Sequence, residues 1–324
     1  MSCSALESRS NEGDLCEICT VCAVTTTTCG RSNLARDGTP GAGDIDSTRR
    51  TWIYRFWNGL LDLTLGSARE YPLVIGGSPA TIKEAPFMAH LTLEFTNSSS
   101  SSSKWRAAAT SSSLCTASII GDRWILTAAH SVTPPKSSRL QKVTVSVGSA
   151  DRTVGTRITA DSYKAHPDYN AGNPYTGSDI APIRLPSALA FGPTIQPICY
   201  PTSDNVGTAT SACEQTFYGW GLLHATDTTS PVNLQKVNVK VTTSASTDCL
   251  GVDGKIICVS GSTPSTGTCN GDSGGPLVVR HGGIAFVSGV NSYHQPEGCA
   301  VKPNGHTKTS AFASWVQSTI ASWS

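Results

Sequence analysis

The sequence has few charged residues and no long apolar run. Charged residues make up 15% of the 324-residue chain, and the formal net charge is only +1. A chain with so little excess charge has no electrostatic reason to bind nucleic acid or an anionic membrane. No run of about 18 apolar residues is present, so we expect no transmembrane helix. Serine, threonine and glycine must therefore cover much of the surface, which is typical of an extracellular protein.

A recognisable signal peptide is also missing. Residues 1–30 contain neither a basic segment nor an apolar core of about 7–15 residues. The twelve cysteines nevertheless predict disulfides, which persist in oxidising compartments. We therefore expect a secreted, extracellular protein whose given N-terminus is incomplete or misassigned.

The closely spaced N-terminal cysteines raise the alternative of a zinc site. Cys16, Cys19, Cys22 and Cys29 have tight spacing, but no second pair of cysteine or histidine ligands follows at a distance. We favour disulfides or misassigned coding sequence for this segment. The sequence thus predicts no metal and no cofactor.

Composition divides the chain near residue 73. Residues 1–73 lack strand alternation and include the Gly/Pro-rich segment 38–43, so we expect a largely irregular pro-region or linker with one short helix over 52–65. Beyond it, apolar runs alternate with Gly, Pro, Ser and Thr, which predicts an all-β barrel or sandwich over 74–324. The spacing of apolar residues predicts a C-terminal helix over 311–320. The expected strands cover residues 87–95, 117–129, 143–147, 179–185, 234–241, 277–279 and 284–290.

A serine flanked by glycines lies in the segment G-D-S-G-G-P at residues 271–276. A free serine hydroxyl is a weak nucleophile and needs both a base and hydrogen-bond donors for the oxyanion. Gly271 and Gly274 permit unusual dihedral angles, so the N–H groups of Gly271 and Ser273 could point at one cavity. Alone, the G-x-S-x-G pattern is equally consistent with an ordinary glycine-rich turn.

Two other segments supply a base and an acid. His130 ends the apolar run 124–130, as a half-buried strand would deliver a base to a cleft, and Asp179 begins the apolar run 179–185. Taken singly, His130 could be a core or loop histidine and Asp179 a turn residue. The chain order His130, Asp179, Ser273 is one of the known orders of a catalytic triad.

In combination, these motifs resemble the chymotrypsin/trypsin-like (S1-type) serine endopeptidases over about three quarters of the chain. The resemblance implies two packed six-stranded antiparallel β-barrels with the site between them, followed by a C-terminal α-helix. It assigns His130 as general base, Asp179 as its orienting acid and Ser273 as nucleophile, with the N–H groups of Gly271 and Ser273 as oxyanion hole. It also implies peptide hydrolysis through an acyl-enzyme, protein or peptide substrates, and a monomer.

The resemblance places substrate-binding residues at Gly267, Thr268, Asn270, Ser292, Tyr293, His294 and Asn304. Trypsin-like members carry an aspartate six residues before the nucleophile, where this chain has Gly267. We therefore expect an apolar or small side chain before the scissile bond. His294 and Asn304 would narrow the pocket; alternatively, His294 and nearby His306 would attract an acidic side chain.

The resemblance also implies activation by cleavage. V-I-G-G at residues 74–77 is similar to the mature N-terminus of the family. We expect a zymogen cut between Leu73 and Val74, whose new α-amino group inserts beside Asp272.

The cysteines match the family pattern only in part. The resemblance pairs Cys249 with Cys258 and Cys269 with Cys299. The expected partner position of Cys115 holds Ser131, and that of Cys213 holds Val279. Cys199 resembles a cysteine that tethers the pro-region, and its candidate partners are Cys3, Cys16, Cys19, Cys22 and Cys29.

Two other function classes stay open. A catalytically inactive binding module on the same fold would explain the missing bridge of the histidine loop. An esterase of the α/β-hydrolase type would share the G-x-S-x-G pattern, but it requires a helix after Ser273, whereas residues 276–279 are typical of a strand.

Overall fold

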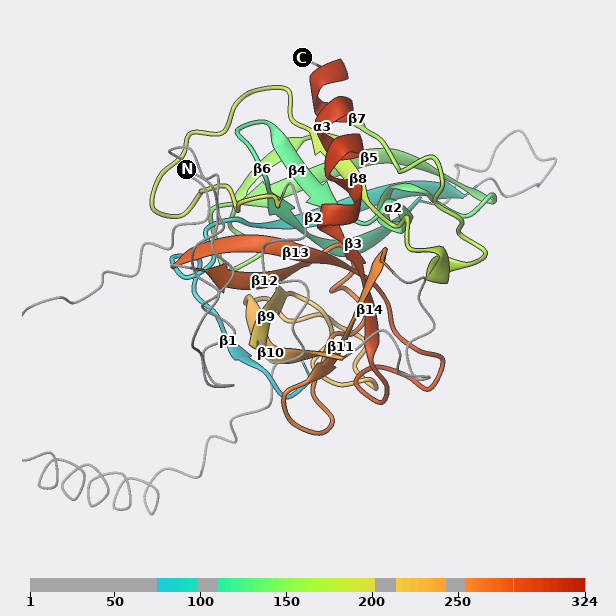
Figure 1. Cartoon of the computed structure of the whole chain (residues 1–324). Coiled ribbons are helices and arrows are strands. Elements are labelled where there is room, and N and C mark those ends of the chain that lie inside the picture. Colours follow the sequence, from blue (N-terminus) through green and yellow to red (C-terminus); the bar gives the residue numbers. More distant parts are fainter. Residues whose placement is uncertain (1–74, 98–109, 202–213, 243–253, 282, 324) are drawn as a thin grey trace, which may run out of the picture. The chain divides into compact units, whose positions relative to one another are not determined.

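The computed structural model describes residues 75–97, 110–201, 214–242, 254–281 and 283–323 (Figure 1). The expected pro-region, with its short helix over 52–65, lies outside these residues. So do Leu73, Val74, Cys213 and Cys249. In the described part of the chain, no helix is long and apolar enough to cross a membrane.

The described residues form two antiparallel β-sheets of seven strands each, joined by loops and short helices. The first consists, in spatial order, of β6 (Thr156–Thr159), β5 (Ser138–Val147), β2 (Met88–Asn97), β3 (Thr110–Ile119), β4 (Trp124–Thr127), β8 (Ala181–Arg184) and β7 (Ser162–Tyr163). The second consists of β1 (Ser78–Pro79), β10 (Gln235–Thr242), β11 (Ile256–Gly261), β14 (Asn304–Lys308), β13 (Ile284–Tyr293), β12 (Pro276–His281) and β9 (Glu214–Gly219). An additional pairing of β9 with β10 closes the second sheet into a barrel.

The expected all-β class with a C-terminal helix is confirmed. The strand count per sheet differs from the predicted six because the two-residue strands β1 and β7 add an edge to each. Strand β10 follows the simple rule of alternation, with Val237 and Val239 buried and Lys240 exposed. Strand β13 is buried along almost its whole length because side chains on both of its faces are packed, with Val287 in the shared core cluster and Phe286 against Cys199 and Val279.

Buried side chains from both sheets meet in one core cluster. Leu126 of β4 and Ile180, directly before β8, pack in the same cluster as Trp220, directly after β9, and Val278 of β12. Each of these residues is at most 2% exposed. The segments next to His130, to Asp179 and to residues 271–276, here called the serine turn, are therefore all anchored in this shared core.

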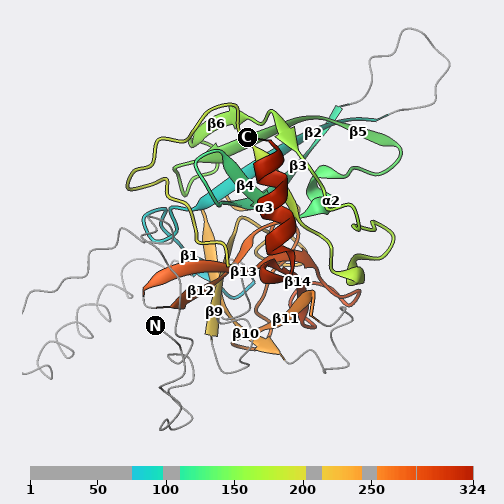
Figure 2. The ribbon, with the colours of Figure 1, turned by 45° about the horizontal axis from the view of Figure 1, so that its top comes forward.

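The C-terminal helix α3 (Ala313–Ser322) follows the second sheet in sequence but contacts the first (Figures 1 and 2). A 3-10 turn, η2 (Thr309–Phe312), leads into it from β14. Just beyond its end, Trp323 stacks on Trp124 with ring centroids 5.8 Å apart, and its carbonyl accepts a hydrogen bond of 2.6 Å from Arg184. The helix therefore fastens the end of the chain onto the first sheet.

Candidate active site

His130 and Asp179 lie beside the ends of two neighbouring strands of the first sheet. His130 lies in the short helix α2 (Ala129–Val132) directly after β4, and Asp179 lies two residues before β8. Because β4 and β8 are antiparallel, with Thr127 opposite Ala181, the segments after β4 and before β8 emerge at the same end of the sheet. Strand register thus brings together two residues that are 49 positions apart.

The Asp179 carboxylate binds His130 through both of its oxygen atoms. Oδ1 accepts the backbone N–H of His130 at 2.8 Å, and Oδ2 lies 2.7 Å from the ring atom Nδ1. The hydroxyl of Ser292 on β13 donates to the same Oδ2 at 2.6 Å. The Asp179 side chain is 1% exposed, whereas that of His130 is 29% exposed. The carboxylate is therefore enclosed, and the imidazole retains an accessible edge.

Mutual attraction sets the charge states of this pair. Burial would raise the pKa of Asp179, but attraction to His130 and hydrogen bonds from His130 and Ser292 lower it overall. For His130, burial opposes protonation, while attraction to Asp179 and their hydrogen bond raise its pKa above 6.5. The imidazole is thus a stronger base than a free histidine.

Ser273 lies in the turn between β11 and β12 of the second sheet. Gly271 and Gly274 have φ values of +94° and +82°, which only glycine adopts without strain. Within this turn, the N–H groups of Asp272, Gly274 and Gly275 donate to backbone carbonyls. In the described structure, the N–H groups of Gly271 and Ser273 have no acceptor, so both are free to bind an oxyanion.

Contacts between the sheets place the serine turn next to the histidine segment. Thr116 on β3 donates its N–H to the Ser273 carbonyl and its hydroxyl to the Gly271 carbonyl, both at 2.9 Å. A Cβ atom on Gly274 would overlap Thr127 Oγ1 and lie 3.0 Å from the Ala128 nitrogen. The serine turn therefore packs against the end of β4. Among the described residues the Ser273 hydroxyl has no hydrogen-bond partner, and such contacts are commonly loose in a free enzyme.

Asp272 is completely buried beside Ser273. Its Oδ1 accepts the N–H of Gly221 at 2.8 Å, and its Oδ2 accepts the N–H of Cys269 at 2.9 Å. Burial raises the pKa of Asp272 to about 7, against the effect of these two hydrogen bonds. No cationic side chain among the described residues pairs with it.

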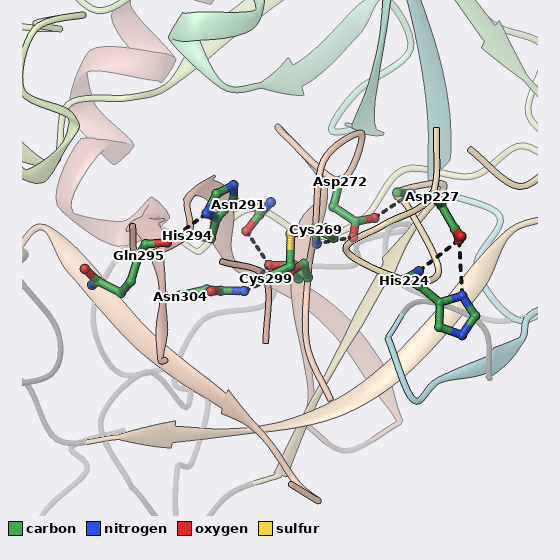
Figure 3. The surroundings of a disulfide bond; sticks show 11 residues. His224, Asp227, Cys269, Asp272, Asn291, His294, Gln295, Cys299 and Asn304 are labelled. Carbon is green, nitrogen blue, oxygen red and sulfur yellow. Dashed lines mark hydrogen bonds and ion pairs between the residues drawn. A yellow bond between two sulfur atoms is a disulfide. The ribbon is translucent and has the colours of Figure 1, made fainter. Parts of the chain in front are cut away.

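The predicted pocket residues divide into buried and exposed groups. Gly267, Thr268 and Asn304 are buried and line one cavity of about 350 Å³. Tyr293 is also largely buried and packs edge to face on Tyr175, with ring centroids 4.9 Å apart. Of the remaining three predicted pocket residues, Ser292 is buried, whereas Asn270 and His294 are exposed. Figure 3 shows His294 and Asn304 on one side of the Cys269–Cys299 disulfide, with Asp272 on the other.

His306 cannot contribute to a pocket that attracts an acidic substrate side chain. Its side chain is completely buried and packs edge to face against Phe217, with ring centroids 5.8 Å apart. Burial lowers the pKa of His306 to about 3. A neutral, enclosed imidazole offers no positive charge to an acidic substrate.

The comparisons with known proteins all indicate the same family. The trypsin family model matches residues 74–316. The chain is 32% identical to chymotrypsin-like elastase family member 1 of Macaca fascicularis over 216 residues, covering 64% of this chain and 79% of that protein. It is 31% identical to the fibrinolytic enzyme isozyme C of Lumbricus rubellus, covering 75% and 98%. The solved structure of mouse neuropsin superposes with a TM-score of 0.56 at 24% identity, covering 75% and 98%.

The chain belongs to the trypsin family. It is a serine endopeptidase, and its substrates are proteins or peptides. The structural similarity to neuropsin shows that the fold is also that of this family.

The trypsin-family disulfides are preserved in part. The predicted bond between Cys269 and Cys299 is present, with Cα atoms 5.0 Å apart. Cys199 and Cys258 also take part in disulfides. The expected partner of Cys258, Cys249, lies outside the described residues, as do the N-terminal cysteines expected near Cys199. Cys115 is a free, buried thiol.

Sequence reasoning missed two residues that shape this trypsin-family site. Thr116 connects the serine turn to the first sheet, and the buried Asn291 connects it to β13. The Asn291 carbonyl accepts the Gly274 N–H, and its own N–H donates to the Gly275 carbonyl, both at 2.9 Å. The position of Asn291 directly before Ser292 was the available signal for its proximity to the site.

Proposed function

We propose that this endopeptidase cleaves after neutral side chains, with Ser273 as nucleophile, His130 as general base and Asp179 as the acid that orients it. The observation that carries the proposal is the binding of both the His130 backbone and its ring by one enclosed carboxylate. This arrangement fixes the proton on Nδ1 and leaves Nε2 as the basic atom. Attraction to His130 and the hydrogen bonds from His130 and Ser292 keep Asp179 ionised beside an imidazolium when one forms.

Each step of the proposed reaction then has a named group. His130 Nε2 takes the proton of the Ser273 hydroxyl as Oγ bonds to the substrate carbonyl carbon. The N–H groups of Gly271 and Ser273 stabilise the resulting oxyanion, and each such donor lowers the barrier by roughly 3 kcal/mol. His130 then gives its proton to the leaving amine as the C–N bond breaks. Water repeats the sequence on the acyl-enzyme and releases the acid.

The preference for a neutral side chain follows from Gly267. No carboxylate occupies the position at which trypsin-like enzymes bind lysine or arginine. An ammonium or guanidinium group in a largely buried pocket without a counter-charge loses its hydration at a large cost in free energy. Lysine and arginine peptides should therefore be poor substrates.

We also propose that the enzyme is made as a zymogen and activated by cleavage between Leu73 and Val74. Support comes from Ile75, which packs against Leu222, Cys269 and Cys299, and whose carbonyl accepts the Gly267 N–H at 3.0 Å. The second residue after the cleavage site therefore already contacts the segment that binds Asp272. A new α-ammonium group would supply the cation that the buried Asp272 lacks.

The broader assignment follows from the same evidence. We propose that residues 1–73 form a pro-region and residues 74–324 the peptidase domain, which acts extracellularly as a monomer without a metal or cofactor. The disulfide between Cys269 and Cys299 and the cysteine-rich sequence favour an oxidising compartment.

The test is covalent labelling with a serine-directed fluorophosphonate. The activated protein and the control variant Ser314→Ala, altered on the exposed side of α3, should be labelled and should cleave a peptide library. Ser273→Ala should lose both properties while keeping its circular dichroism spectrum. Labelling that persists in Ser273→Ala would identify another nucleophile, and N-terminal sequencing of the active protein checks the cleavage site.

A further inference from the structure

The connection between β9 and β10, here called the β9–β10 loop (residues 220–234), packs against the serine turn. The Leu222 N–H donates to the Asn270 carbonyl at 2.8 Å. Ser230 faces Gly271, because a Cβ atom built on Gly271 would lie 3.1 Å from the Ser230 hydroxyl oxygen. The loop therefore borders the backbone that carries one of the two oxyanion donors.

The hydrogen bond from Leu222 sets the direction of that donor. The Asn270 carbonyl and the Gly271 N–H belong to one peptide unit, which is planar and trans, so they point in opposite directions. Gly271 has a φ of +94°, and a glycine can adopt other dihedral angles at little cost. Rotation of this peptide would turn the N–H away from the oxyanion. The contacts that hold the β9–β10 loop therefore also hold the Gly271 N–H in its binding orientation.

The first sheet holds both ends of this loop through the connection between β5 and β6 (residues 148–155). The Ala150 carbonyl accepts the indole N–H of Trp220 at 2.9 Å and the backbone N–H of Leu234 at 2.8 Å. One carbonyl thus binds the first and the last residue of the β9–β10 loop.

Arg152, in the same connection, holds the middle of the loop. Its backbone N–H donates to the Val232 carbonyl at 3.0 Å. Its guanidinium group donates from Nε to the Pro231 carbonyl at 2.9 Å and from Nη2 to the Ser230 carbonyl at 3.2 Å. No acidic side chain in the described structure forms an ion pair with Arg152. The guanidinium group therefore serves the loop, and one of its bonds ends on the residue that faces Gly271.

We infer that Arg152 is a positioning residue for the oxyanion hole, acting through the β9–β10 loop on the peptide between Asn270 and Gly271. This inference rests on the proposed function, which assigns the Gly271 N–H to the oxyanion. Removal of the guanidinium group should loosen the loop and allow the peptide to rotate. An oxyanion donor stabilises the transition state more than the bound substrate, so its displacement lowers kcat and leaves KM nearly unchanged.

Kinetics on a peptide amide with a neutral side chain before the scissile bond test this inference in the activated protein. Arg152→Met removes the guanidinium donors and keeps an apolar stem. The matched control is Arg157→Met, because Arg157 donates to the Thr153 carbonyl in the same connection but not to the β9–β10 loop. Rates are expressed per serine titrated to completion with a fluorophosphonate, so unfolded protein does not lower kcat.

We expect the kinetic effect to be confined to kcat. Complete loss of an oxyanion donor lowers kcat about 10²–10³-fold, so a loosened donor in Arg152→Met should lower it about ten-fold, with KM within about two-fold of the control. Arg152→Lys should give an intermediate kcat, because an ammonium group keeps the charge and donors but lacks the fixed planar fork.

Amide hydrogen exchange reports the loop itself and does not require catalysis. In the inactive Ser273→Ala protein, adding Arg152→Met should accelerate exchange of the Leu222 amide about ten-fold, whereas adding Arg157→Met should not. The Val287 amide, which donates to the Cys199 carbonyl elsewhere in the second sheet, should exchange at the same rate in all three proteins.

Three results would overturn the inference. They are a kcat of Arg152→Met equal to that of the control, an effect of Arg152→Met on KM alone, and exchange at Leu222 that is unchanged or rises together with that at Val287. Faster exchange at Leu222 alone, in a protein whose activated form hydrolyses no peptide, would contradict the proposed function and leave the positioning of the loop by Arg152 intact. Normal hydrolysis by Arg152→Met would support the proposed function and refute the inference.

Discussion

Asp272 should make the uncleaved protein less stable as the pH rises. Burial raises its pKa to about 7 from 3.8, so the folded protein keeps a proton that the unfolded chain has already lost. Stability from this group is complete below pH 3.8 and disappears as the pH rises through 7. A shift of about three units corresponds to a loss on the order of 4 kcal/mol in the free energy of unfolding.

Urea unfolding of Ser273→Ala, which cannot cleave itself, measures this effect. The single variant and a double variant that also carries Asp272→Asn would be compared from pH 4 to pH 8, because other titrating groups cancel in the difference. The single variant should lose on the order of 4 kcal/mol relative to the double variant over this range. Cleavage between Leu73 and Val74 should remove the loss by pairing an ammonium with Asp272. A difference independent of pH would refute the assigned pKa, and an unchanged loss after cleavage would refute the activation mechanism.

Two further predictions concern the base and the serine turn. Because the pKa of His130 is raised and the base must be neutral, kcat/KM should increase with pH through a midpoint above 6.5, and a midpoint below that value would contradict the pairing with Asp179. Gly274→Ala should lower the free energy of unfolding by at least about 2 kcal/mol, since a Cβ there would overlap Thr127 and adopt a left-handed conformation. The control Gly254→Ala, with φ +78° but open space around it, should cost about 1 kcal/mol in chemical denaturation, and equal costs would refute the steric argument.

The sequence predicted strands best where a strand buries apolar side chains. The runs at 87–95 and 284–290 correspond to β2 and β13. The polar strand β14 (Asn304–Lys308) was missed, because its sequence N-G-H-T-K has no apolar alternation. It forms a strand because β11 and β13 bind it from both sides. Such pairing depends on segments far apart in the chain, and no local pattern reports it.

The same distinction applies to the site. His130, Asp179 and Ser273 lie in short motifs whose local sequence constrains their backbone, and they could therefore be selected from the sequence. Thr116 acts through a hydrogen bond to a residue 155 positions away. The orientation of the Asn304 amide likewise depends on Thr268, 36 positions away. Local reasoning predicted a neutral pocket, but these long-range contacts required the folded chain.

The unpaired Cys115 bears on whether the histidine segment can hold its geometry without the family's disulfide. Cys115 and Ser131 are both buried, and burial raises the pKa of the Cys115 thiol to about 11, so it stays protonated and unreactive. Without a covalent bridge in this segment, the Asp179 carboxylate still binds the backbone N–H of His130 as well as its ring. One carboxylate therefore sets both the position and the protonation of the imidazole. The absence of the bridge is thus no argument for an inactive binding module, because these two contacts hold His130 without it.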